Sequence, residues 1–188
     1  MSMPARIRWT AEHVRHLNAA NPRHWPRYEL VAGRLLVTPA PAPRHQLAIG
    51  WLFERLAPYT RANGIGTTML SPADIEVNPG ELNQPDVFVV SSPARLASWH
   101  QVDSLALVIE VVSPGSAPHD RGDKRRAYSS AGVEYWLVDL DAQRIERWHP
   151  NAHVADVCSH TLTWHPSVGA VALELNLAEL WREAALTL

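Results

Sequence analysis

The feature that most constrains the fold is an apolar run, Leu105–Val112, that contains a single charged residue, Glu110. Such a run is typical of a β-strand that is covered on both faces, as in the sheets of α/β proteins. It ends at Ser113-Pro114-Gly115, and the polar segment that follows predicts a helix over Pro118 to about Ala131. The next apolar run, Glu134–Leu140, completes a right-handed crossover if the two strands are parallel.

The rest of the chain indicates further helices and short strands, separated by clusters of glycine and proline. The predicted helices are Thr10 to about Ala20, about His45 to Arg61, a turn at Pro93–Trp99 and a last helix from about Leu177. The predicted strands are the hairpin Tyr28–Val31 and Arg34–Thr38, then Ile65–Leu70, Ala73–Val77, Val87–Val90, Arg144–Trp148, His153–Cys158 and Ala170–Leu175.

Length and composition indicate one globular domain, because 188 residues with 46% hydrophobic residues can bury a core and no repeat or linker divides them. We expect a domain over residues 1–188, with an N-terminal helix at about 10–20, a core at about 28–148 and C-terminal strands and a helix at about 153–188. The single cysteine, Cys158, suits a reducing compartment. The N-terminus lacks the apolar segment of a signal peptide and no run has membrane-spanning length, which predicts a cytoplasmic protein away from membranes.

Two carboxylates are expected to meet at one end of the predicted sheet. Asp86 starts the strand Val87–Val90, and Glu110 lies near the end of its own strand. If the two strands are antiparallel neighbours, the start of one lies beside the end of the other. A lone carboxylate in a covered strand is costly unless it is paired or bound to a cation. Taken singly, each acid has an ordinary explanation, because Glu110 can reach water or an arginine and an aspartate after Pro85 is a common turn residue.

Lys124 is the only lysine among 17 basic residues. Asp120, Lys124 and Tyr128 are spaced by four residues and share one face of the predicted helix. A surface ion pair between Asp120 and Lys124 is the ordinary explanation. A compact ammonium, however, can approach a phosphate oxygen or a water where a planar guanidinium cannot replace it. The single lysine therefore suggests a specific role.

Together these residues supply what metal-assisted hydrolysis of a phosphodiester requires. Asp86 and Glu110 are expected to hold a hard divalent cation, Mg²⁺ or Mn²⁺, that also takes oxygens of the scissile phosphate. Lys124 is expected to orient or help deprotonate the attacking water. Three neighbouring arginines are candidates for phosphate contacts, although a solvated helix face is the default explanation for such a cluster: Arg121, Arg125 and Arg126.

Several short motifs follow one another along the chain. In order they are Tyr28-Glu29-Leu30 with Gly33, Pro43-Arg44-His45, Pro85-Asp86, EVVSP from Glu110, DRGDK from Asp120 with Tyr128, and GVEYWLVD from Gly132. This combination resembles the Uma-type restriction-endonuclease family of the PD-(D/E)xK nuclease superfamily, over about Tyr28 to Trp148. The resemblance implies an α/β (α+β) fold, with a restriction-endonuclease-like three-layer α/β/α core and a mixed β-sheet. It also implies Mg²⁺-dependent cleavage of DNA.

By position, the resemblance implies that Asp86 and Glu110 are metal ligands and that Lys124 is the catalytic lysine. In the superfamily pattern the lysine stands two residues after the glutamate, where this chain has Val112. The ammonium would come from the following helix instead, a change that the family shares.

The supporting residues that the resemblance suggests are Glu29, His45, Asp120 and Tyr128. For His45, a role in capping or packing the start of its helix explains its position at least as well. Asp74 points to the same region only weakly.

Two other functions fit the sequence. The first is a catalytically inactive nuclease-fold module that binds nucleic acid or a protein partner. The net charge of -2 keeps this alternative open, because it gives no general attraction to a nucleic-acid substrate. The second is a histidine-based metal enzyme, although the histidines show no pair at strong ligand spacing. The pairs considered are His13 with His16 on the terminal helix, and His160 with His165 in loop-like sequence.

DNA is the expected partner of the nuclease, and symmetric cutting of duplex DNA by the superfamily suggests a homodimer. Apolar terminal segments with Trp9, Trp164 or Trp181 could provide the dimer surface. The nuclease hypothesis makes one geometric demand: the Asp86 and Glu110 carboxylates must lie close together, with Lys124 Nζ directed toward them.

Overall fold

The computed structural model describes residues 8–23, 25–91, 99, 102, 104–166 and 170–185. Its centre is a six-stranded mixed sheet in which neighbouring strands are antiparallel, except for one parallel pair formed by the fifth and sixth strands of the chain. In spatial order the strands are β3 (Thr67–Leu70), β4 (Val87–Val90), β5 (Leu105–Val111), β6 (Glu134–Asp139), β7 (Arg144–Trp148) and β8 (Asp156–Cys158).

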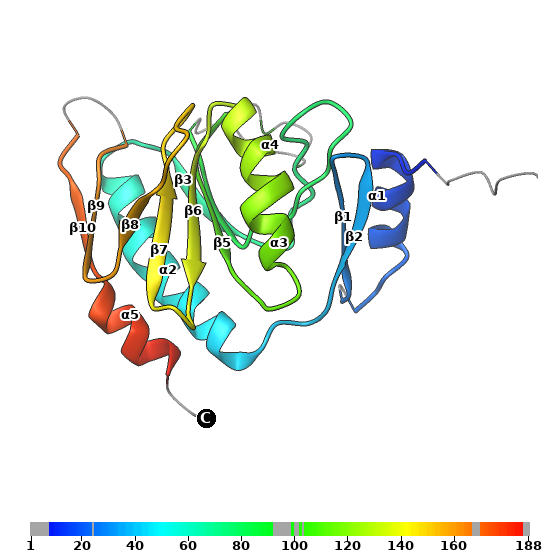
Figure 1. Ribbon diagram of the computed structural model, residues 1–188. Helices are drawn as coiled ribbons and strands as arrows, with labels where there is room; N and C mark the ends of the chain where they lie inside the picture. The colour runs from blue at the N-terminus through cyan, green and yellow to red at the C-terminus, as the bar shows by residue number, and fades with distance from the viewer. Residues whose placement is uncertain are drawn as a thin grey trace, which may run out of the picture.

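Helices cover both faces of this sheet. On one face lie α2 (Pro43–Ala62) and α5 (Leu177–Ala184), and on the other lie α3 (Ala117–His119) and α4 (Arg125–Ser130) (Figure 1). α2 contacts α5 and strands β3, β4 and β5, whereas α4 contacts β6. The predicted three-layer α/β/α arrangement is confirmed, and so is the crossover between the parallel strands β5 and β6.

Two hairpins flank the sheet (Figure 1). β1 (Arg27–Val31) and β2 (Arg34–Thr38) turn at Ala32 and Gly33, whose φ values of 49° and 72° match a two-residue hairpin turn. This hairpin packs against α1 (Ala11–Ala19), and Thr10 caps that helix as predicted. The second hairpin joins β9 (Thr161–Trp164) to β10 (Leu173–Asn176) beside α5.

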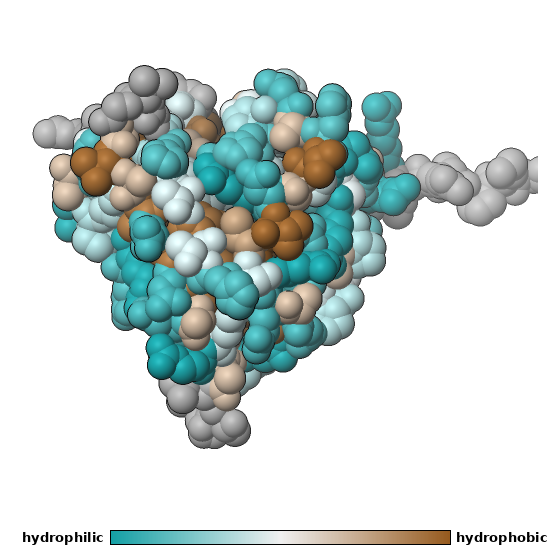
Figure 2. All heavy atoms as spheres, turned by 60° about the vertical axis from the view of Figure 1, so that its left-hand side comes forward, coloured by the Kyte–Doolittle hydropathy of each residue, from teal (hydrophilic) through white to brown (hydrophobic). Residues whose placement is uncertain are grey.

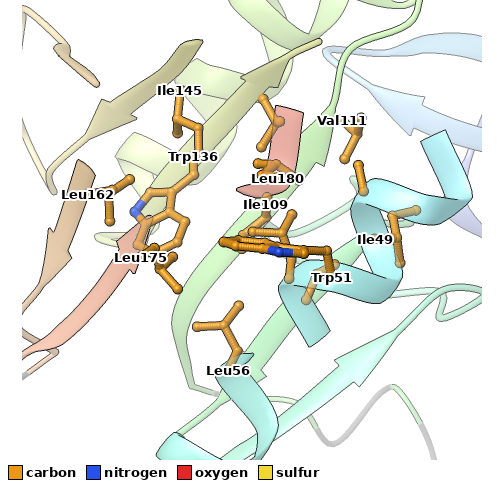
Figure 3. Packing of buried hydrophobic residues seen from close by; sticks show 14 of the residues in the cluster. Ile49, Trp51, Leu56, Ile109, Val111, Trp136, Ile145, Leu162, Leu175 and Leu180 are labelled. Carbon is orange, nitrogen blue, oxygen red and sulfur yellow. The ribbon is translucent and has the colours of Figure 1, made fainter. Parts of the chain in front are cut away.

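Two core clusters lie on opposite sides of the sheet, because successive side chains of a strand point to opposite faces, and a third, smaller cluster lies between α1 and the β1–β2 hairpin. Trp136, Ile109 and Val111 pack toward Trp51 and Ile49 of α2 in the first cluster (Figure 3). The second cluster, under α4, gathers Phe88, Val90, Val108, Tyr128, Tyr135 and Leu137. Glu110 alternates with the residues of the first cluster and so belongs to the α4 side.

The segment between β5 and β6 differs from the prediction of one regular helix over Pro118 to Ala131. The chain forms α3, then a wider π-helical turn at Asp120–Lys124, and then α4. In a straight α-helix, Tyr128 would lie about 80° around the axis from Asp120, because each residue turns by about 100°. A turn with i→i+5 hydrogen bonds contains more residues and offsets part of that drift.

Among the described residues, one predicted strand is absent, and one strand was not predicted. Ala73–Val77 forms no strand; Ile75 makes only an isolated bridge with Asn83, and the apolar pattern reflects burial of Ala73 and Ile75 in a loop. β9 was not predicted, although Leu162 and Trp164 alternate with exposed residues as a half-buried strand requires. The turn predicted at Pro93–Trp99 lies outside the described residues except for its last position.

The surface in the view of Figure 2 is mainly hydrophilic, with separate hydrophobic groups between polar residues. The large hydrophobic residues exposed in the described part of the chain are Val37, Leu70, Val154, Val157 and Val171. No helix among the described residues is both long enough and apolar enough to cross a membrane. Trp164 is fully buried and Trp181 is 9% exposed, so the suggestion that these two tryptophans form a dimer surface was wrong.

Candidate active site

Asp86 and Glu110 meet at one end of the sheet, as the sequence predicts. Val87 pairs with Ile109 in the antiparallel register of β4 and β5, so the residues just beyond this pair lie side by side. Asp86 is 3% exposed and Glu110 is 2% exposed. Both line one cavity of about 420 Å³ together with Lys124, Asp120, the loop at residues 38–42 and the loop at residues 112–116.

Lys124 lies at the end of the π-helical turn, and its ammonium points into this cluster. Its Nζ is 3.0 Å from Glu110 Oε1, 3.0 Å from Glu29 Oε1 and 3.6 Å from Asp120 Oδ1. The lysine is 3% exposed, so the surface ion pair that explained it from sequence alone is excluded. Tyr128, one turn further along, donates a hydrogen bond from its hydroxyl to Glu110 Oε1 at 3.2 Å.

Asp86 accepts hydrogen bonds from three separate elements. Arg27, at the start of β1, donates to Oδ1 at 3.0 Å, and the backbone N–H of Val111 donates to Oδ2 at 2.9 Å. His45, in the first turn of α2, has Nε2 3.1 Å from Oδ2. His45 therefore holds the carboxylate of Asp86, and the capping role considered for it is wrong.

The sequence did not identify Arg27 as part of the site. Its guanidinium is 5% exposed, stacks over the Trp25 ring at 4.9 Å, and also donates to Ser71 Oγ at 3.0 Å. The signal in the sequence is an arginine immediately before the motif Tyr28-Glu29-Leu30, but its burial cannot be inferred from the sequence alone.

The three arginines predicted to contact phosphates do not line the cavity. Arg121 pairs with Asp139 at 2.6 Å, Arg125 lies over the Trp148 ring at 4.5 Å, and Arg126 pairs with Asp123. Each side chain thus has a partner on the outer surface of the crossover, as the solvated-face explanation predicts.

Asp74 also lies apart from the cluster. It accepts hydrogen bonds from Asn18 and Gln84 beside a different cavity, which Arg15 and Trp99 line as well.

The pKa values of the two strand carboxylates are shifted in opposite directions. Burial alone would raise the pKa of Asp86, but the hydrogen bond from His45 and the charge of Arg27 outweigh it and hold that pKa below its usual range. Burial raises the pKa of Glu110 well above its ordinary value; Lys124 opposes this, while Asp86, Asp120 and Glu29 add to it. One acid is therefore stabilised as a carboxylate and the other is inclined to hold a proton.

Oxygen atoms without hydrogen-bond partners remain in the cluster. They are Glu29 Oε2 and Asp120 Oδ1, both buried. Among the described residues, no group of three or more His, Cys, Asp or Glu side chains has the arrangement of a metal site. The part of the chain that the structure describes therefore contains no site for a histidine-based metal enzyme.

Comparisons with known proteins identify the family and the fold of the chain. A family model named Uma2, with the description "Putative restriction endonuclease", matches residues 12–178. The uncharacterized protein slr1290 of Synechocystis is 34% identical over 77 residues, a match that spans 40% of this chain and 40% of that protein. The crystal structure of a putative nuclease of the DUF820 group from Anabaena variabilis superposes with a TM-score of 0.72 at 16% identity, covering 94% of this chain and 99% of that one. At that identity the superposition establishes the fold, which is the one expected from the sequence.

Proposed function

Because the chain belongs to the Uma2 family of putative restriction endonucleases, we propose that it is an endonuclease that uses Mg²⁺ or Mn²⁺ to hydrolyse phosphodiester bonds of DNA. One observation carries the proposal. Asp86 and Glu110 line a common cavity at the ends of adjacent strands, and Lys124 Nζ lies 3.0 Å from Glu110 Oε1.

The donor atoms suit a hard divalent cation. Mg²⁺ is usually held by one or two carboxylates, with waters and substrate phosphates completing its shell. Asp86 and Glu110 would provide these two carboxylates, which is compatible with the lack of a closed group of three ligands among the described residues. When bound, Mg²⁺ would supply a Lewis acid that polarises the phosphate and lowers the pKa of a coordinated water.

The charges of the cluster also favour a cation. Four buried acids surround two fixed positive charges: Glu29, Asp86, Glu110 and Asp120, with Arg27 and Lys124. If all four acids ionise, two negative charges in the cluster have no counterpart, and burial makes this costly. Either Glu110 keeps a proton, as its raised pKa allows, or a divalent cation neutralises the excess.

Arg27 and His45 would prepare Asp86 as a ligand. Oδ2 already accepts from two donors, His45 and the Val111 N–H, while Oδ1 accepts from Arg27 alone. Each carboxylate oxygen has two lone-pair sites, so Oδ1 retains one for a cation. The two side chains also keep Asp86 ionised, which a metal ligand requires.

Lys124 would act as a positive charge and a hydrogen-bond donor. Burial lowers the pKa of a lysine, but Glu110, Glu29 and Asp120 outweigh it and raise the pKa of Lys124 well above its ordinary value. The ammonium therefore stays protonated at neutral pH. Of the two roles expected for it, we assign orientation of the attacking water and stabilisation of charge on the phosphate, rather than removal of a proton.

The proposal extends to the setting of the protein. A homodimer would let two such sites cut both strands of a duplex. The cytoplasm suits a chain whose one cysteine, Cys158, is free.

Cleavage of supercoiled plasmid DNA tests the function. With Mg²⁺ or Mn²⁺ the wild type should nick or linearise the plasmid, and EDTA should abolish the reaction. Asp86→Asn and Lys124→Gln should each slow cutting by about 100-fold or more, as expected for the loss of a group that stabilises transition-state charge. Asp156→Asn makes the same change as Asp86→Asn, and Arg61→Gln likewise replaces a positive charge by glutamine; both positions are exposed, so these variants serve as controls.

Each alternative gives its own result. Equal cutting by the wild type and both site variants would mean that a contaminating nuclease is responsible. Binding of DNA without cutting by any of them would favour the inactive binding module.

A further inference from the structure

The ammonium of Lys124 is surrounded by a cage of three buried carboxylates. Its three acidic partners come from separate parts of the chain: Glu29 from β1, Glu110 from β5 and Asp120 from the π-helical turn. Their nearest oxygens lie 3.0, 3.0 and 3.6 Å from Nζ. An ordinary ion pair needs one carboxylate, whereas this lysine is enclosed by three.

This cage has unused coordinating capacity. Glu29 and Asp120 are each 1% exposed, and Glu29 Oε2 and Asp120 Oδ1 have no hydrogen-bond partner. Buried polar atoms are normally satisfied, so two orphaned oxygens around one cation are unusual. Glu110 and Asp120 belong to the cage and also line the main cavity, whereas Glu29 does not line that cavity.

We propose that Lys124 takes the place of a second metal ion, so that the site binds one divalent cation, at Asp86 and Glu110, and the Glu29–Glu110–Asp120 cage binds another only when the lysine charge is removed. Binding of the first cation, at Asp86 and Glu110, rests on the proposed function, whereas binding of a second cation by the cage does not. Carboxylate oxygens bind Mg²⁺ at about 2.0–2.1 Å, so the cage has to contract by about 1 Å at its two nearer oxygens and by about 1.5 Å at Asp120 Oδ1. In the wild type, the ammonium prevents that contraction and repels a second cation.

The number of bound Mn²⁺ ions per chain, measured by electron paramagnetic resonance during titration, tests this inference. The wild type should bind one ion, Lys124→Gln should bind two, and Lys124→Gln combined with Glu29→Gln should return to one. Lys124→Gln keeps a side chain of similar size with hydrogen-bond donors but no charge. A second ion in the wild type, or no additional ion in Lys124→Gln, would overturn the proposal.

Glu29→Gln alone keeps the test decisive if the lysine variant does not fold. Since Glu29 belongs to the cage and not to the Asp86–Glu110 position, this variant should still bind one ion, with an affinity lowered by less than about tenfold because the cluster loses one nearby negative charge. A tenfold loss of affinity would make Glu29 a ligand of the first ion and contradict the division proposed here. If the wild type binds no ion while Lys124→Gln binds one, the proposed function fails and the cage stands.

Discussion

Glu110 is the residue on which the charges of the site converge. It accepts hydrogen bonds from Lys124 and Tyr128 on one oxygen, and it lies beside Asp86 at the end of the sheet. The raised pKa of Glu110 follows from burial and from the neighbouring acids, since Lys124 offsets them only in part. A site of this kind should be sensitive to pH in the absence of metal and less so in its presence.

This sensitivity gives a prediction for stability. The pKa of Glu110 is raised above its model value of 4.5, so the folded chain keeps a proton that the unfolded chain has already lost. Stability in EDTA should therefore fall as pH rises through that interval. Urea unfolding at about pH 5 and about pH 8 should give a larger loss for the wild type than for Glu110→Gln.

Asp86 contributes with the opposite sign. Its pKa is lowered below its ordinary value of 3.8, so its contribution to stability should be lost only as pH falls below that value.

For Glu110, an equal loss of stability between about pH 5 and about pH 8 in the wild type and in Glu110→Gln would contradict the raised pKa.

At the scale of elements, β3 and β4 approach each other closely at Val90, the end of β4 that lies away from Asp86. Gly66 has a φ of 155°, and a Cβ there would lie 1.9 Å from the carbonyl oxygen of Val90, the last residue of β4. Gly64, two residues earlier, has a φ of 62° and open space around the position of a Cβ. A side chain at Gly66 would therefore clash with the backbone of β4, whereas a side chain at Gly64 would only strain the local backbone conformation.

Gly66→Ala should cost about 3 kcal/mol or more, because backbone atoms cannot yield as a flexible side chain does. Gly64→Ala should cost about 1–2 kcal/mol, the penalty for a left-handed conformation alone. Thermal or urea unfolding measures both. Similar losses for the two variants would contradict the close approach of β3 and β4 at this point.

The π-helical turn is the element that aligns Lys124 with Glu110. Deletion of Gly122, in the middle of the turn, should convert the segment to a regular α-helix and rotate Lys124 relative to Asp120 and the residues that precede it. Helical content by circular dichroism should be retained, while Mg²⁺-dependent cutting falls by about 100-fold. Cutting at the wild-type rate would mean that the wide turn is not needed to place the lysine.

The main elements of the crossover could be predicted because their signals are local. The apolar run of β5, the helix start near Pro118 and the glycine after the helix each follow from the sequence. The π-helical turn could not be predicted, because the Lys124 at its end is held by tertiary contacts with Glu29 and Glu110 that helix propensity does not reveal. A strand was wrongly predicted at Ala73–Val77 for a related reason, because buried residues of a loop can alternate with less buried ones as they do in a strand.

The candidate site was predictable to a similar degree. Asp86, Glu110 and Lys124 come together as expected, because strand order and the crossover rule bring them to one end of the sheet. Arg27 was missed, because its role depends on how the β1–β2 hairpin docks onto the end of β4. The assignment of a catalytic function to these residues remains a prediction.

At the scale of the whole molecule, the excess negative charge of the site is concentrated in a chain with a net charge of only -2. Several arginines that could offset it are paired at the surface instead, as Arg121 is with Asp139. Cation binding should therefore stabilise the folded chain as a whole, since the unfolded chain has no such cluster.

The expected gain is about 2.7 kcal/mol when Mg²⁺ is at 100 times its dissociation constant. For a domain of this size, that corresponds to an increase of roughly 5–10 °C in Tm. Asp86→Asn should remove the increase, and the exposed matched variant Asp156→Asn should keep it. An equal increase in Tm for both variants would place the cation elsewhere.

The most direct test of the central claim is the position of the cation itself. In crystals of the wild type soaked with Mn²⁺, an anomalous difference map should show a peak in contact with the carboxylates of Asp86 and Glu110, with Lys124 Nζ still beside Glu110. A map without a peak at these two carboxylates at saturating Mn²⁺, or with its peak on another group of residues, would contradict the proposed metal-dependent nuclease site.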